Sequence, residues 1–263
     1  MSLTMYQIDA FTDTLFHGNP AAVCPLTTWL PDALMQSIAE ENNLAETAFY
    51  VREGDVYRIR WFTTVCEVDL CGHATLATAH ALFHHEGFRG DTIRFISRSG
   101  PLSVRREGDL LVLDFPVDTL RTAPLPEGLD RALGGAPVET YRGKDDYLLV
   151  YRSQSEISAI DPDFGIIGRV PCRGVIVTAP GDSVDFVSRF FGPQSGVPED
   201  PVTGSAHTTL VPYWAKRLKK SDFDALQLSR RGGRLRCTLS GERVHIAGHA
   251  VTFFKGTLSL PVP

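Results

Sequence analysis

Hydrophobic and polar positions follow two different periods in the first part of the chain. Residues 56–64 alternate with a period of two, which predicts a strand whose buried side is formed by Tyr57, Ile59, Trp61 and Thr63. Residues 31–42 follow the helical period, with an apolar face of Leu34, Met35, Ile38 and Ala39. Pro31 suits the first position of that helix, because an N–H group would have no intrahelical partner there.

Short strand patterns recur along the rest of the chain and are separated by glycine-containing turns. They predict strands at residues 6–11, 48–52, 92–97, 110–115, 147–151, 175–179, 184–191, 226–229, 235–239, 243–246 and 250–260. The hairpin-like spacing of these strands favours antiparallel pairing over alternating parallel βαβ units.

Two stretches of small and apolar residues predict helices that have no wide polar face. One covers residues 72–86, and the other follows Gly204 and extends to about Ala215. Gly87 is a suitable C-terminal cap for the first helix. Pro212 is expected to kink the second helix or to shorten its regular part.

Both predicted helices follow the same series of features. A strand ending in Arg-aromatic-Phe comes first (Arg60-Trp61-Phe62 and Arg189-Phe190-Phe191), then acidic residues, then a glycine with a polar neighbour (Gly72-His73 and Gly204-Ser205). The series predicts a diverged internal duplication. A chance likeness between two helices that begin at glycine is the alternative.

The fold class that follows is α+β, with two pseudo-symmetric domains, each a curled, mostly antiparallel sheet around a central helix. A length of 263 residues is sufficient for two such domains. We place the halves at residues 1–120 and 121–263. The Pro- and Gly-rich residues 122–137 have little apolar periodicity and are the candidate crossing between the two halves.

Composition argues against several classes of partner. Hydrophobic residues make up 43% of the chain and charged residues 22%, as in soluble globular proteins, and no apolar run approaches the ~20 residues of a membrane helix. A formal charge of −5 without a basic block disfavours nucleic acid and anionic membrane surfaces as main partners. The five cysteines include no Cys-x-x-Cys motif and indicate neither a disulfide framework nor a zinc site. We therefore expect the reducing cytoplasm, also because no signal peptide is recognisable.

The glycines that open the two helices indicate where a ligand binds. N–H groups in the first turn of a helix have no intrahelical partner, and Gly72 and Gly204 allow an anionic group to approach them closely. Asn19, in the sequence Gly18-Asn19-Pro20, is a further candidate for lining a binding cleft, although turn formation explains it equally well.

Along most of its length the sequence resembles the phenazine-biosynthesis PhzF family, and more distantly the diaminopimelate epimerase fold. The matching segments are residues 9–12, 18–23, 45–49 and 60–63 and, most specifically, 70–77 and 196–207. The resemblance implies an active site in a cleft between two domains, a homodimer, and chemistry without a metal or an organic cofactor. It also implies a small anionic metabolite as the binding partner.

Site residues follow from the same resemblance. The acid/base carboxylate falls on Glu46, and the polar substrate contacts fall on His73, Asp200 and Ser205. Backbone N–H groups that meet the substrate fall on Gly72 and Gly204.

The best-known reaction of the family moves a proton between two carbons of a dihydro-hydroxyanthranilate ring. One carboxylate can do this if burial raises its pKa towards neutrality, and we expect Glu46 to have that role. His73 would donate to a substrate carboxylate or carbonyl, or act as a second acid at neutral pH. Asp200 would orient His73 or hold a substrate amine or hydroxyl.

These residues also have ordinary structural explanations. Glu46 could be a solvated surface charge, Ser205 a helix cap, and Asp200 a turn residue before a proline. Three histidines near the end of the first helix, His80, His84 and His85, lack a third type of ligand and are explained as its polar end.

Cys71 raises the possibility of a two-cysteine racemase, because cofactor-free amino-acid racemases of the related fold use one thiol in each domain. The second half has no cysteine between Cys172 and Cys237. A small buried residue is therefore the preferred explanation of Cys71. Three hypotheses remain: a proton-shuttling isomerase, an epimerase of an amino-acid-like substrate, and a binding or interaction module without turnover.

Overall fold

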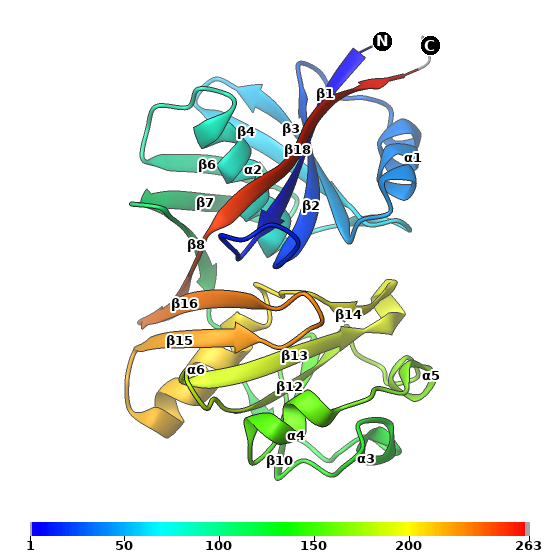
Figure 1. Ribbon diagram of the computed structural model, residues 1–263, viewed down its shortest axis with the longest axis vertical. Coiled ribbons are helices and arrows are strands. Elements are labelled where there is room, and N and C mark those ends of the chain that lie inside the picture. Colours follow the sequence, from blue (N-terminus) through cyan, green and yellow to red (C-terminus); the bar gives the residue numbers. More distant parts are fainter. Residues whose placement is uncertain (1, 261–263) are drawn as a thin grey trace. The chain divides into compact units, whose positions relative to one another are not determined.

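The computed structural model describes residues 2–260, and its contacts divide the chain into two units (Figure 1). Unit 1 consists of the residues up to Asp114 and those from Ala247 onward, and unit 2 is Phe115–Ile246. This division differs from the predicted halves, whose ends, residue 1 and residues 261–263, lie outside the described part. The difference arises because the last strand, β18 (Ala250–Ser259), pairs along the whole of the first, β1 (Ser2–Ala10), and so belongs to unit 1.

Unit 1 is a mixed, mostly antiparallel sheet with two helices. β1 pairs antiparallel with β18 and β2, β3 with β4, β4 with β5, and β6 with β7 and β7 with β8, whereas β2–β3 and β4–β6 are parallel. Its elements are β1 (Ser2–Ala10), β2 (Asn19–Leu26), α1 (Asp32–Asn42), β3 (Glu46–Glu53), β4 (Val56–Phe62), β5 (Glu67–Val68), α2 (Gly72–His84), β6 (Thr92–Ser97), β7 (Gly100–Glu107), β8 (Leu110–Pro116) and β18 (Ala250–Ser259).

The central helix of unit 1 is buried on all sides. Every side chain of α2 is buried except those of His80 and His84 near its C-terminal end. This confirms the predicted helix without a wide polar face, although its last residue is His84 instead of residue 86. Gly87 then adopts the left-handed φ of +69° expected of a residue that ends a helix.

Unit 2 repeats the pairing pattern of unit 1. β10–β11 is antiparallel, β11–β12 parallel, β12–β13 and β13–β14 antiparallel, β13–β15 parallel and β15–β16 antiparallel. Its elements are β9 (Arg121–Thr122), α3 (Leu129–Ala132), β10 (Glu139–Arg142), β11 (Asp146–Val150), α4 (Gln154–Ala159), α5 (Phe164–Ile167), β12 (Gly174–Pro180), β13 (Phe186–Gly192), η1 (Pro193–Ser195), β14 (Val197–Asp200), α6 (His207–Leu218), β15 (Asp222–Gln227), β16 (Gly233–Ser240) and β17 (Arg243–Gly248), the last continuing into unit 1.

The same ion pair occurs in both units. Arg60 donates from Nε and Nη2 to Glu67 at 2.8 and 2.7 Å, and Arg189 donates from the same atoms to Glu199 at 2.7 and 3.0 Å. Each guanidinium also lies over the phenylalanine two positions further along its strand. Matched strand pairings and matched ion pairs support the duplication, and they give Glu199 a structural role.

The second central helix begins later than predicted. α6 starts at His207, while residues 204–206 form a turn in which the N–H of His207 donates to the Gly204 carbonyl at 3.0 Å. Pro212 does not end the helix, which continues to Leu218. The Thr208 carbonyl, which Pro212 cannot bond, accepts instead from the Asp118 N–H at 3.1 Å.

Two composition-based expectations can be compared with the structure. The five cysteines all lie within residues 2–260, and the structure shows no disulfide bond among them, in agreement with the absence of a disulfide pattern in the sequence. Within residues 2–260, no helix combines the length and the apolar character needed to cross a membrane.

Candidate functional site

In unit 1, the start of one strand and the start of one helix bring Glu46, Cys71 and His73 together. Glu46 is the first residue of β3, opposite Ala21 of the parallel strand β2. Cys71 is the extended residue before α2, and His73 is the second residue of that helix. Glu46 therefore stands at the start of a strand that has a neighbour on each side, β2 and β4.

The three side chains form a compact cluster. His73 Nε2 lies 3.2 Å from Glu46 Oε2, and His73 Nδ1 lies 3.5 Å from Cys71 Sγ. The Glu46 side chain is 16% exposed, whereas His73 is almost fully buried. Glu46 is thus the member of the cluster that a ligand can reach, and His73 lies next to it on the buried side.

Burial determines the charge of His73. It lowers the pKa of His73 to about 3, so the imidazole is neutral at pH 7. Burial therefore argues against the expectation that His73 serves as an acid at neutral pH, and one ring N–H remains for donation. With Glu46 and Cys71 beside its two ring nitrogens, His73 has partners within unit 1 other than the predicted Asp200.

The cluster also has the donor types of a metal site. The ligand atoms of Glu46, Cys71 and His73 all lie within 4.8 Å of one another. A carboxylate, a thiol and an imidazole can together bind zinc. Any test of chemistry at this cluster therefore needs a chelator control.

The start of α2 leaves backbone donors available. Among the described residues no side chain caps the helix, and Thr75 uses both its N–H and its hydroxyl on the Cys71 carbonyl, at 3.2 and 2.5 Å. The N–H groups of Gly72 and His73 precede the first intrahelical bond and can bind an acceptor.

Asn19 lies deeper than a cleft-lining residue would. It is the first residue of β2, opposite Ala10, and is fully buried. The turn before it requires glycine, because Gly18 has a φ of +64° and a Cβ there would lie 2.2 Å from the Ala10 carbonyl oxygen. This environment gives Asn19 a place in the core of unit 1.

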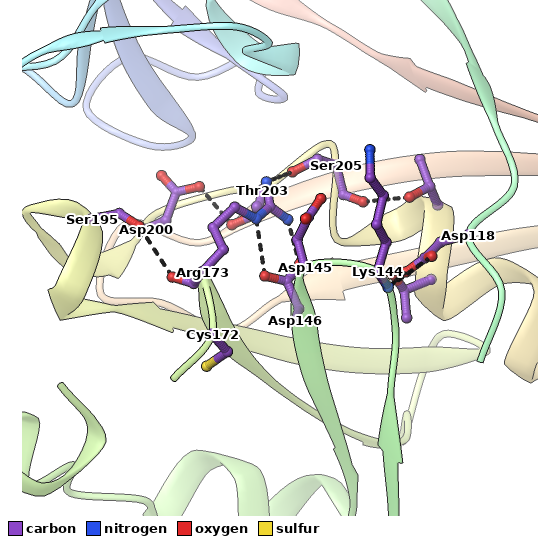
Figure 2. Close-up of polar contacts among 12 residues, drawn as sticks. Asp118, Lys144, Asp145, Asp146, Cys172, Arg173, Ser195, Asp200, Thr203 and Ser205 are labelled. Carbon is purple, nitrogen blue, oxygen red and sulfur yellow. Dashed lines mark hydrogen bonds and ion pairs between the residues drawn. The ribbon is translucent and has the colours of Figure 1, made fainter. Parts of the chain in front are cut away.

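In unit 2, Asp200 and the segment before α6 form a second group of polar residues (Figure 2). Asp200 ends β14 opposite Phe190, and its Oδ2 accepts from the Thr203 hydroxyl at 2.5 Å. Buried Gln227 connects the two: its Nε2 donates to the Asp200 carbonyl at 2.7 Å, and its Oε1 accepts from the Thr203 N–H at 2.8 Å. These bonds hold the loop that leads to Gly204 and Ser205.

An arginine that the sequence does not single out lies beside Ser205. Arg173 Nη1 donates to Ser205 Oγ at 2.9 Å, and its Nε donates to Asp146 Oδ1 at 2.9 Å (Figure 2). Burial alone would lower the pKa of Arg173, but the hydrogen bonds and charge of Asp146 outweigh it and leave that pKa above its ordinary value.

The duplication is the signal that could have revealed Arg173. Phe49 pairs with Arg60 in unit 1 as Val177 pairs with Arg189 in unit 2. Three positions before these residues stand Glu46 and Gly174, so Arg173 lies one residue before the position that corresponds to Glu46. The corresponding strands are β3 and β12. β3 begins with the acidic Glu46, whereas β12 begins one residue after the basic Arg173.

Comparisons with known proteins identify the family of the chain. The family model described as phenazine biosynthesis-like protein, PhzC-PhzF, matches residues 8–256. A Pseudomonas aeruginosa protein named an uncharacterized isomerase is 56% identical over 261 residues, which cover 99% of this chain and 100% of the relative. A PhzF-family crystal structure from Enterococcus faecalis superposes with a TM-score of 0.95 at 48% identity, covering 99% of this chain and 100% of that one.

The fold likeness extends further than the sequence likeness. The structure of a predicted epimerase from Pseudomonas aeruginosa matches with a TM-score of 0.77 at 20% identity, covering 98% of this chain and 100% of that chain. At this identity the comparison concerns the fold alone, and it is consistent with the α+β, epimerase-like architecture predicted from the sequence.

Proposed function

Because the chain belongs to the phenazine biosynthesis-like PhzC-PhzF family, we propose that it is an isomerase that moves a proton between two carbons of a small carboxylate-bearing metabolite. The reaction would be of the trans-2,3-dihydro-3-hydroxyanthranilate isomerase type. The observation that carries the proposal is the cluster in which the partly exposed Glu46 carboxylate lies 3.2 Å from a buried, neutral His73.

Glu46 removes the proton from carbon and returns it at a second carbon. We assign the single ring N–H of His73 to Nε2, which faces the Glu46 carboxylate at 3.2 Å, so that Nδ1 is the acceptor for the Cys71 thiol at 3.5 Å. Because burial disfavours the protonated form of its ring, His73 is a weak base and does not compete with Glu46 for the substrate proton near pH 7. Glu46 is therefore the group that carries the proton.

The negative charge that develops on the substrate needs hydrogen-bond donors. The N–H groups of Gly72 and of Gly204, together with the Ser205 hydroxyl, are the donors we assign to it. Asp200 accepts a hydrogen bond from a substrate amine or hydroxyl. We propose that the reaction uses neither a metal nor an organic cofactor, as the family resemblance implies.

Proton NMR in D₂O tests the reaction class. The protein, with and without a chelator, is incubated with trans-2,3-dihydro-3-hydroxyanthranilate and with a panel of amino acids. Deuterium incorporation with a shifted ring double bond supports the proposal. Deuterium at an inverted α-carbon would make the protein an epimerase, and binding of these compounds without exchange would make it a non-catalytic module. Exchange that disappears with the chelator would contradict the cofactor-free mechanism.

A further inference from the structure

One guanidinium group in unit 2 is held rigidly although the proposed mechanism does not use it. The backbone of Arg173 is anchored on both sides: its N–H donates to the Asp145 carbonyl at 2.8 Å, and its carbonyl accepts from the Ser195 hydroxyl at 3.1 Å. Its side chain lies over the Phe190 ring at 5.4 Å. Arg173 therefore has little freedom to point elsewhere (Figure 2).

A buried carboxylate sets the direction of this side chain. Asp146 is only 3% exposed and begins β11, where the parallel register places it opposite Gly174, next to Arg173. It accepts from both Nε and Nη2 of Arg173. A bidentate pair of this kind fixes the plane of the guanidinium. Nη1 is then directed at Ser205 Oγ, 2.9 Å away.

The hydrogen bond from Arg173 determines in which direction the Ser205 hydroxyl can donate. Because Oγ accepts a hydrogen bond from Nη1, the hydroxyl proton of Ser205 is directed away from Arg173. Within residues 2–260 the structure shows no acceptor for that proton. The nearby N–H groups of the turn at residues 204–206 are donors too, so the Ser205 hydroxyl and these N–H groups together form a group of donors.

A group of donors backed by a cation fits an anionic acceptor. We propose that Arg173, anchored by Asp146, is a positioning residue that makes Ser205 an obligate hydrogen-bond donor to the carboxylate group of the substrate. The inference rests on the proposed function and adds how the carboxylate is recognised. Arg173 acts through Ser205 and need not touch the substrate.

The test compares two probes that differ by one carboxylate. 3-Hydroxyanthranilate carries the group, and 2-aminophenol has the same amine and hydroxyl without it. The dissociation constant of each is measured for the wild type and for Arg173→Met, Arg173→Lys and Arg169→Met. Arg169 is exposed in the same unit, and its side chain forms no hydrogen bond or ion pair within residues 2–260, so Arg169→Met is the matched control.

We expect the wild type and Arg169→Met to bind 3-hydroxyanthranilate more tightly than 2-aminophenol. In Arg173→Met the ratio of the two dissociation constants should fall about 10-fold, as the loss of one charge-assisted hydrogen bond implies. Affinity for 2-aminophenol should stay constant. Arg173→Lys should restore part of the preference, because lysine keeps one cationic donor. A merely structural role would weaken both probes alike, and that result would overturn the inference.

A double-mutant cycle with Ser205→Ala separates action through Ser205 from independent binding. Arg173→Met should have no further effect on the preference when Ser205 is already alanine. Additive losses would refute the proposal. If Arg173→Met does not fold, Arg173→Lys takes its place in the cycle. Failure of the wild type to bind 3-hydroxyanthranilate would refute the proposed substrate class together with the inference, whereas binding with an unchanged preference in Arg173→Met refutes the inference alone.

Discussion

Acidification should destabilise both units, because each contains a histidine that is buried in its neutral form. His73 in unit 1 and His207 in unit 2 are almost or fully inaccessible, and burial lowers their pKa values to about 3 and about 4. In the unfolded chain a histidine has a pKa of about 6.5. The folded state therefore binds fewer protons than the unfolded state between these values.

The sign and size of the effect follow from linkage. A lowered folded-state pKa means that stability is fully present above the unfolded-state pKa and is lost as the pH falls towards the folded-state pKa. Between pH 7 and pH 5 each histidine should cost about 2 kcal/mol, since each pH unit below 6.5 is worth about 1.4 kcal/mol. His80, whose pKa burial also lowers to about 3, acts in the same direction in unit 1.

Urea unfolding at pH 7, 6 and 5 measures this loss. His73→Gln and His207→Gln should each reduce the dependence of the unfolding free energy on pH by about 1 kcal/mol per pH unit or more. Replacement of the exposed His17 by glutamine is the control for the substitution itself. An unchanged dependence in His73→Gln would show that the imidazole is not neutral in the folded protein, and the assignment of Glu46 as the sole proton carrier would lose its support.

Two further predictions concern residues that stabilise the fold around the site. Arg189→Met should destabilise the protein by about 3–5 kcal/mol, because it leaves a partly buried carboxylate and two buried carbonyls without their donor. Arg60→Met should cost less, since Arg60 is 22% exposed against 10% for Arg189, and equal losses in urea unfolding would contradict this. Gly18→Ala should cost more than Gly54→Ala. Both glycines have a left-handed φ, but only at Gly18 does a Cβ meet the backbone, so thermal unfolding of the two variants should differ by several degrees.

The local parts of the fold and site follow from short sequence patterns. Gly72 and His73 open a helix because small apolar residues follow them without a polar stripe, and that helix is found. The duplication is visible in the Arg-aromatic-Phe segments because one ion pair is conserved in place between the two units. The order of strands is also predictable where each pairs with its sequence neighbour.

Other features depend on contacts between distant residues. The pairing of β18 with β1, which moves the division between the units, involves residues about 250 positions apart. Arg173 acquires its role from a parallel register that puts Asp146 next to it, and the sequence spacing of 27 residues gives no sign of this. The neutral state of His73 likewise results from burial by the whole unit and not from its neighbours in the chain.

The central claim, that Glu46 carries the substrate proton, is tested most directly by replacing it with glutamine. The rate of deuterium incorporation from D₂O into trans-2,3-dihydro-3-hydroxyanthranilate is measured for the wild type, Glu46→Gln and the control Glu40→Gln, an exposed position on α1. We predict that Glu46→Gln lowers the rate by about 100-fold or more, as expected for the loss of a general base, while 3-hydroxyanthranilate binding changes only a few-fold. Exchange at the wild-type rate in Glu46→Gln would contradict the claim.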